Sequence, residues 1–580
     1  MDEILTITNE RVDDIPILLT QMEKMGLQNL LDTHFPQHGN WGGLSLGWVI
    51  VIWLTHILSM GDHRLNHVEA WAQNRLHTLR QSTGQLVRAL DFSDDRLADT
   101  LYAFSDDNQW GAFESDFNGH LIRVYALGPR RIRSDSTTAS GYWTVTENGL
   151  FQFGHSKNKR SDLPQVKVML SSLDPLGMPL AVDVLSGQRA DDPLYIPSIT
   201  RVRSGTRVRS GLDRKGVLYV GDCKMASLKT RAFIHAGGDF YLCPLPEKQL
   251  SSEELLAYVQ PVLRGDEPLT SVYRNQQGGK IKLIAKGYES NKTLSAEVNG
   301  ELVTWQERRL VVRSIQQAKA SEARLRVRVA KAKTEVEDLN NQGQGKRRFD
   351  SIQSLKEAAE AIMKRYDVQG CLQLSFEEIV INRRKVRRYK NRPERVCEKR
   401  KFIVNPAIDD VALGLAIEKL GWRVYATDQP SEQLSLDQAV LAYRDEYIVE
   451  RGFGRLKGRP LSLSPLYLQR DDHVTGLIRL LSIGLRVLTL IEFVVRRHLN
   501  EQQTTLQGLY TGNPKRATAR PTSELLLESF EDITLTFIHT LNQTQGHLTP
   551  LLEVQKRILY LLDFSVSIYT RLCTNFEKPP

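Results

Sequence analysis

The stretch Tyr443-Arg-Asp-Glu-Tyr-Ile-Val-Glu-Arg-Gly-Phe-Gly-Arg-Leu-Lys457 decides how the rest of the chain is interpreted. Its apolar residues recur at helical spacing with charged residues between them, and this spacing predicts an amphipathic helix. Glu450 and Lys457 are seven residues apart, close to two helical turns, so they project in nearly the same direction. Such a helix on its own is most often an ordinary solvated surface helix. Two acidic residues far upstream suggest a different role.

Each upstream acidic residue follows a strand-like run. Residues 130–135 predict a short strand that ends at Asp135 and runs into a turn over 134–138. Gly216-Val-Leu-Tyr-Val-Gly-Asp222 is an apolar run that ends in an aspartate, as buried central strands can do. Alone, Asp135 could cap a turn and Asp222 could cap the helix that follows it. The ordered set of three carboxylates makes two independent caps a poor explanation.

The intervening segments predict the fold. Two more strands are expected at 165–170 and 179–185, and a helix and a further strand at 226–236 and 239–243. The expected fold class is mixed α/β: a ribonuclease H-like catalytic core interrupted by a large α+β insertion, with helical N-terminal and C-terminal regions. The predicted regions are a helical DNA-binding or dimerisation region at 1–125, the first part of the core at 126–246, the insertion at 247–420, the second part of the core at 421–500 and a helical region at 501–580.

Asp135, Asp222 and Glu450 are the candidate catalytic and metal-binding residues. Three carboxylates that converge from distant positions can hold two Mg²⁺ ions, because Mg²⁺ prefers hard oxygen ligands. Mn²⁺ is the expected substitute. Two such ions can activate an attacking hydroxyl and stabilise the leaving oxygen in a phosphoryl displacement. The predicted chemistry is therefore metal-dependent phosphoryl transfer.

The charge of the chain favours a polyanionic partner, with nucleic acid the first candidate. The formal net charge is +9 and the pI is about 9.1. Much of the excess lies in the basic run 383–401, in which Arg384, Arg387 and Arg388 are candidate DNA-binding residues. A run of charged residues usually forms a solvated surface. For this run, a solvated surface and contact with DNA phosphates are about equally favoured.

Compartment signals are few. The five cysteines form no Cys-x-x-Cys pair, which argues against a zinc finger or a disulfide framework. The apolar run 44–58 is too short and too interrupted to span a bilayer, so a buried core helix is expected and no membrane partner. The N-terminus lacks the basic segment of a secretory signal. These features fit a protein of the bacterial cytoplasm.

The three carboxylates and the opening stretch resemble the bacterial insertion-sequence DDE transposases. One subgroup has a strand-rich insertion between the second Asp and the Glu, and a signature of Tyr, two residues, Arg, three residues, Glu, six residues and Lys. Tyr443, Glu450 and Lys457 keep this spacing, whereas Glu446 stands at the position of the arginine. The resemblance covers most of the chain, through residue 497, and the Glu-to-Lys segment is its most specific part.

The resemblance implies a DNA transposase that acts as a homodimer on the paired terminal inverted repeats of its element. Water attack at the element end would free a 3′-hydroxyl, which then attacks target DNA. Lys457 would contact a phosphate and Tyr443 would hydrogen-bond the DNA backbone. The further candidate DNA contacts are Arg444 and Arg451, as substitutes for the missing arginine, and Lys224.

Some members of this subgroup form a hairpin intermediate, in which an aromatic side chain of the insertion stacks on a flipped base. Trp305 and Trp422 are candidates by position, although burial in a core is the commoner role of a tryptophan. Two alternatives to a transposase stay open. One is a ribonuclease H-like nuclease that hydrolyses DNA without strand transfer, and the other is a domesticated DNA-binding protein that has lost the chemistry.

Overall fold

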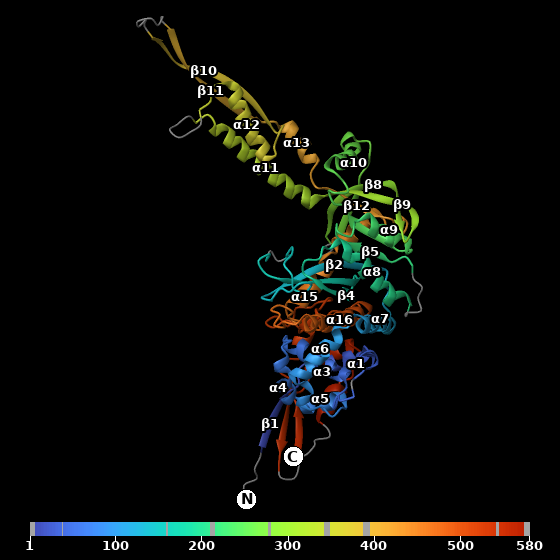
Figure 1. Ribbon diagram of the computed structural model, residues 1–580. Coiled ribbons are helices and arrows are strands. Elements are labelled where there is room, and N and C mark those ends of the chain that lie inside the picture. The colour runs from blue at the N-terminus through green and yellow to red at the C-terminus, as the bar shows by residue number, and fades with distance from the viewer. Residues whose placement is uncertain are drawn as a thin grey trace. The chain divides into compact units, whose positions relative to one another are not determined.

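The computed structural model describes residues 6–37, 39–157, 160–208, 215–275, 280–341, 348–386, 395–540 and 544–573. The chain divides into two compact units (Figure 1). The first unit consists of Met1–Cys243, Ser295–Thr304 and Ala442–Pro580, and the second of Pro244–Leu294 and Trp305–Leu441. The predicted insertion therefore lies mostly in the second unit, which also includes residues 421–441.

The N-terminal part of the first unit is helical. Its helices are α1 (Ile15–Lys24), α2 (Leu27–His34), α3 (Leu46–Met60), α4 (Val68–Gln73), α5 (Leu76–Thr83), α6 (Asp94–Ser105) and α7 (Asp107–Val124). Helix α3 holds the apolar run of the sequence, and from Leu46 to Leu58 only Trp48 is not buried. It is the core helix that the sequence predicts. No helix among the described residues combines the length and the apolar character needed to cross a membrane.

The C-terminal part of the first unit is built on α16 (Asp471–Glu501), a 31-residue helix with a largely buried surface. Arg486 of α16 is fully buried and pairs with Glu114 of α7 at 2.8 Å. The later elements are α17 (Ser523–Glu528), β13 (Thr534–His539), β14 (Thr544–Leu548), α18 (Glu553–Leu561) and α19 (Ser567–Thr570). The region predicted as helical thus also contains a strand pair, which β1 (Thr6–Arg11) extends by antiparallel pairing with β13.

The first unit contains a mixed sheet whose strands run in the order β4-β3-β2-β5-β6. The strands are β2 (Arg131–Ser140), β3 (Gln165–Asp174), β4 (Met178–Ser186), β5 (Leu218–Gly221) and β6 (Phe240–Pro244). The first three are antiparallel, whereas β5 is parallel to β2 and β6 is parallel to β5. Helices α8 (Tyr195–Arg203) and α9 (Leu228–Ala236) form the crossovers. The sheet combines antiparallel and parallel pairs with helices in the crossovers, so the predicted mixed α/β fold class is confirmed.

Strand β2 is longer than the sequence suggests. It continues past Asp135 to Ser140, and Asp135 pairs with Leu170 in the middle of β3. The segment 134–138 reads as a turn because every side chain in it is polar. In the structure Ser134, Thr137 and Thr138 are buried, and the ladder with β3 satisfies the backbone of this segment. The predicted turn is therefore a buried polar strand.

The opening stretch forms two helices instead of one. Helix α14 (Leu436–Arg444) ends before a turn at Asp445-Glu446, and α15 (Tyr447–Lys457) begins directly after it. The Arg133 guanidinium of β2 donates hydrogen bonds to the carbonyl oxygens of Ala442 at 2.6 Å and Tyr443 at 3.5 Å. Carbonyls at a helix end need such external donors, so Arg133 stabilises the end of α14.

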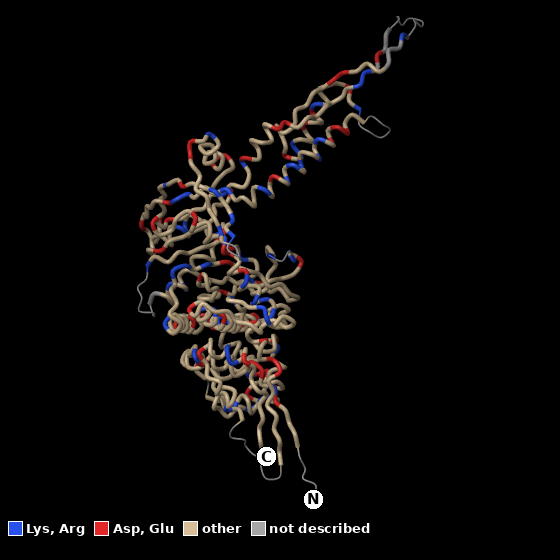
Figure 2. The backbone as a smooth tube through the Cα atoms, turned by 180° about the vertical axis from the view of Figure 1, so that it is seen from behind, with Lys and Arg blue, Asp and Glu red and all other residues tan. Residues whose placement is uncertain are grey.

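The second unit holds two apolar clusters. One lies between α10 (Ser252–Arg264) and a group of strands in the order β12-β9-β8-β7. These strands are β7 (Thr270–Asn275), β8 (Ile281–Val298), β9 (Glu301–Ser314) and β12 (Trp422–Thr427). The other cluster joins α11 (Ile315–Asp338), α12 (Ile352–Tyr366), α13 (Asp410–Glu418) and the antiparallel ribbon of β10 (Leu372–Val386) and β11 (Arg395–Ile408). Figure 2 shows Lys and Arg residues spread over both units.

Candidate active site

Asp135 and Asp222 lie side by side in the sheet. Ser134 of β2 is the register partner of Gly221 of β5. Asp135 is the next residue within β2, and Asp222 directly follows the end of the parallel strand β5. Both line a small cavity of about 10 Å³, room for about one water molecule. Its lining residues are Arg133, Ser134, Asp135, Gly221, Asp222, Tyr443, Glu446 and Val449. The cavity lies within the first unit, between the sheet and the junction of α14 with α15.

Asp135 is held by two donors. Its Oδ1 accepts hydrogen bonds from the Lys157 ammonium at 3.0 Å and from the Ser136 backbone N–H at 2.7 Å. Burial raises the pKa of Asp135; Lys157 opposes that rise and the charge of Asp222 adds to it. The two aspartates therefore repel each other, as ligands of a shared cation do before the cation binds.

Asp222 is held by a buried tyrosine. The Tyr195 hydroxyl of α8 donates a 2.7 Å hydrogen bond to Asp222 Oδ1, which also accepts from the Lys224 backbone N–H at 2.8 Å. Burial raises the pKa of Tyr195 well above its usual value, and the negative charge of Asp222 adds to the rise. Tyr195 therefore stays protonated and keeps Asp222 oriented as an acceptor.

Two glutamates of the opening stretch lie at different depths. Glu446 lines the cavity, and burial raises its pKa, with further increases from the charges of Asp135 and Glu450. Glu450, the predicted catalytic residue, is exposed on the first turn of α15 and is not among the lining residues. Sequence reasoning treated Glu446 only as a departure from an arginine. Glu446 and Glu450 are four residues apart, a spacing that places two side chains on one helix face. This spacing could have identified Glu446 as a second candidate carboxylate.

The predicted cationic contacts have different surroundings. Lys457 is half-buried. Burial lowers its pKa most, the charge of Lys157 lowers it further, and the charge of Asp135 raises it. The Lys224 ammonium lies 3.8 Å from Asp192, and both side chains are exposed. Lys457 thus lies within electrostatic range of Asp135 and Lys157.

Arg451 is engaged inside the protein. Both of its terminal nitrogens bond the Glu492 carboxylate of α16, with a distance of 2.6 Å for Nη1. Arg455 pairs with Glu492 and with Glu524 at 2.6 Å each, and Arg496 pairs with Glu492 at 2.5 Å. This cluster joins α15 to α16 and α17, and it was missed in the sequence because its members are widely separated along the chain.

The remaining predicted residues lie in several places. Tyr443 lines the cavity, and Arg444 is the last residue of α14. Arg384 lies in β10, where its register partner is Cys397, whereas Arg387 and Arg388 lie outside the described residues. Trp305 and Trp422 are 4% and 6% exposed. Both are therefore core residues, which was the alternative to stacking on a flipped base.

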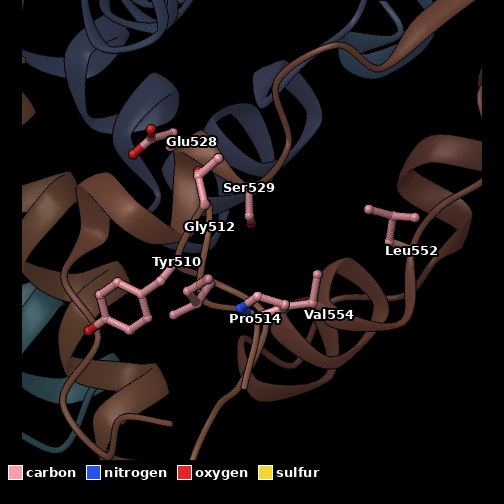
Figure 3. Close-up of a pocket in the computed structure, with 10 residues that line it drawn as sticks. Tyr510, Gly512, Pro514, Glu528, Ser529, Leu552 and Val554 are labelled. Carbon is pink, nitrogen blue, oxygen red and sulfur yellow. The ribbon is translucent and has the colours of Figure 1, made fainter. Parts of the chain in front are cut away.

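A larger cavity lies in the C-terminal part of the first unit. It has a volume of about 280 Å³ and is lined by residues between Gly508 and Val554 (Figure 3). Glu528 is its one charged lining residue among those the structure describes. The cavity therefore lacks the paired carboxylates and cations that phosphoryl transfer needs.

The residues of the small cavity suit a hard divalent cation by their chemistry. Asp135, Asp222 and Glu446 offer carboxylate oxygens, the ligand type that Mg²⁺ prefers. Within the described part of the chain, no three His, Cys, Asp or Glu side chains are already gathered closely enough to hold a metal ion. Side-chain rotation at the cavity would have to accompany metal binding.

Comparisons with known proteins give little. No family model and no curated protein matches the chain. Among solved structures, a cryo-EM structure of piggyBac transposase in a synaptic complex with hairpin DNA matches with a TM-score of 0.23 and 8% sequence identity. The match covers 86% of this chain and 87% of that chain. A TM-score this low carries no argument. The function is therefore inferred from the strand order and the side chains of the chain itself.

Proposed function

We propose that the chain is a metal-dependent DNA transposase, which cleaves DNA at the ends of its element and joins the freed ends to target DNA. One observation supports this function best. Asp135 and Asp222 adjoin each other on parallel strands of a ribonuclease H-like sheet, and Glu446 lines the same cavity. Carboxylates grouped in this way beside cationic side chains suit the in-line displacement at a phosphodiester.

In this proposal the chain's own residues bind and orient the reactants. Asp135 and Asp222 hold Mg²⁺ or Mn²⁺, and Glu450 or Glu446 completes the ligand set. The bound metal supplies Lewis-acid activation of the attacking oxygen and the leaving oxygen. Lys457 holds a phosphate near the scissile bond as a point charge. Water attacks the phosphodiester and displaces the 3′-oxygen of the cleaved strand. The resulting 3′-hydroxyl attacks a phosphodiester of the target and displaces the target's own 3′-oxygen, so one phosphodiester replaces another.

The test is cleavage of a labelled duplex that carries the element end, in Mg²⁺, by the full-length chain. We expect Asp135→Asn and Asp222→Asn to reduce the rate of nicking by at least about 1000-fold, because each removes a metal-binding carboxylate. Glu446→Gln and Glu450→Gln are assayed separately. The substitution that reduces the rate of nicking more identifies the third metal ligand. The proposal fails if both aspartate variants cleave at the rate of the wild type.

A matched control and a product assay complete the experiment. Glu553→Gln removes a carboxylate that is 91% exposed on α18 and should leave the rate unchanged. Joined product on gels separates a transposase from a nuclease that only hydrolyses DNA. Specific DNA binding without cleavage in Mg²⁺ or Mn²⁺ would identify the chain as a binding protein that lacks the chemistry. The mass of the complex with paired ends tests the proposed homodimer.

A further inference from the structure

The Lys157 side chain bonds Asp135, one of the proposed metal ligands. Its ammonium group donates to Asp135 Oδ1 at 3.0 Å and also to the carbonyl oxygen of Ser136. The backbone N–H of Lys157 donates to Thr138 Oγ1 at 3.3 Å, so the residue is anchored to β2 at two levels. Lys157 follows β2 in the connection to β3, and no sequence motif pointed to it.

Lys157 shares its surroundings with a second cation. Its charge lowers the pKa of Lys457, whereas Asp135 raises it, so all three side chains lie within electrostatic range of one another. Once a divalent cation neutralises the neighbouring carboxylates, these two ammonium groups are suited to a phosphate oxygen. The Lys157 side chain is 36% exposed and the Asp135 side chain 22%, so DNA could reach both.

A divalent cation at Asp135 would compete with the Lys157 ammonium, which already bonds Asp135 Oδ1. The two positive charges would share one carboxylate, and like charges repel at such short range. Lysine has a flexible four-carbon stem, so its ammonium can move while the backbone stays in place. An adjacent DNA phosphate is the anion that it would meet in a complex.

We propose that Lys157 neutralises Asp135 until the metal binds, and that metal binding releases its ammonium to a DNA phosphate beside the scissile bond. This inference rests on the proposed function, since it requires a metal at Asp135. Lys157 then has two successive partners, and its removal has opposite effects on the two ligands. A purely structural lysine would not produce this pair of effects.

The first measurement is Mn²⁺ binding to the full-length chain without DNA, by titration calorimetry. We expect Lys157→Met to bind Mn²⁺ about two- to fivefold more tightly, because a competing cation with the strength of a partly exposed ion pair is gone. Lys157→Arg keeps the charge and should bind as the wild type does. Lys556→Met, which breaks a 2.8 Å ion pair with Glu553 on α18, is the matched control.

The second measurement is DNA affinity in Ca²⁺ at several salt concentrations. We expect Lys157→Met to weaken binding and to reduce the slope of log K against log salt by about 0.9, the loss of one phosphate contact. Lys157→Arg should restore the slope. Thermal melting of each variant confirms that it is folded.

Asp135→Asn distinguishes the two possible failures. If Asp135→Asn binds Mn²⁺ as the wild type does, the proposed metal site fails and the role of Lys157 fails with it. If Asp135→Asn loses Mn²⁺ while Lys157→Met binds it equally or more weakly, only the role of Lys157 is overturned. Tighter Mn²⁺ binding with an unchanged salt slope overturns the transfer to phosphate.

Discussion

At the scale of single residues, the candidate site depends on hydrogen bonds that orient its carboxylates. Tyr195 is buried and its hydroxyl donates to Asp222 at 2.7 Å. Hydrogen bonds to charged groups contribute about 1.5–3 kcal/mol. We therefore expect Tyr195→Phe to slow DNA cleavage by about tenfold or more in single-turnover assays, because Asp222 loses its fixed orientation.

Tyr125→Phe is the matched control for that substitution. The Tyr125 hydroxyl accepts a 2.8 Å hydrogen bond from Gln21, also in a buried environment, but it does not line the cavity. The two variants should lose similar stability. Equal cleavage rates for both would contradict a positioning role for Tyr195.

At the scale of elements, the orientation of α15 depends on its ion pairs with α16. Burial favours a raised pKa for Glu492, but hydrogen bonding to Arg451 and the charges of Arg455 and Arg496 outweigh it and lower the pKa. Removing one partner of a buried ion-pair cluster costs about 3–5 kcal/mol. We expect Glu492→Gln to lower the melting temperature by several degrees and to reduce cleavage, because α15 carries Glu450.

An exposed glutamate of α16, the helix that carries Glu492, provides the control. Glu501→Gln, at the end of α16, should change neither the melting temperature nor cleavage. If Glu492→Gln melts early yet cleaves DNA at the normal rate below its melting temperature, the cluster stabilises the fold without positioning α15.

At the scale of the whole molecule, a buried carboxyl makes stability depend on pH. Burial raises the pKa of Asp14, before α1, from 3.8 to about 7. The folded chain therefore retains a proton that the unfolded chain loses, so the contribution of this carboxyl to stability is fully present below pH 3.8 and is lost as the pH rises towards 7. A displacement of this size corresponds to roughly 4 kcal/mol. Burial lowers the pKa of His56 to about 4 and lowers that of His63, and both groups act in the opposite direction, so the contribution of Asp14 has to be measured against a variant.

Asp14→Asn isolates this contribution, because an amide of nearly the same size does not titrate. From pH 5 to pH 8, the melting temperature of the variant should fall less, or rise more, than that of the wild type. An unchanged difference would show that other groups cause the pH dependence.

The sequence predicts the features that depend on local patterns. The apolar run of α3, the strand that ends before Asp222 and the helix that joins Glu450 to Lys457 all follow from residue spacing. The continuation of β2 past Asp135 depends instead on its ladder with β3. The break between α14 and α15 involves Arg133, which bonds Ala442 across 309 positions. A reading of neighbouring residues cannot reveal such a contact.

The pairing of β1 with β13 has a consequence for the synthesis of the chain. The Thr536 hydroxyl donates a hydrogen bond to Asn9 across 527 positions. At roughly 5–20 residues per second, a ribosome needs about half a minute to two minutes to make the intervening chain. During that time Thr6–Arg11 has no native strand to pair with, and an unpaired strand edge attracts other chains and chaperones. Only a chain translated past His539 can form this pairing, so the pairing distinguishes such chains from those interrupted earlier.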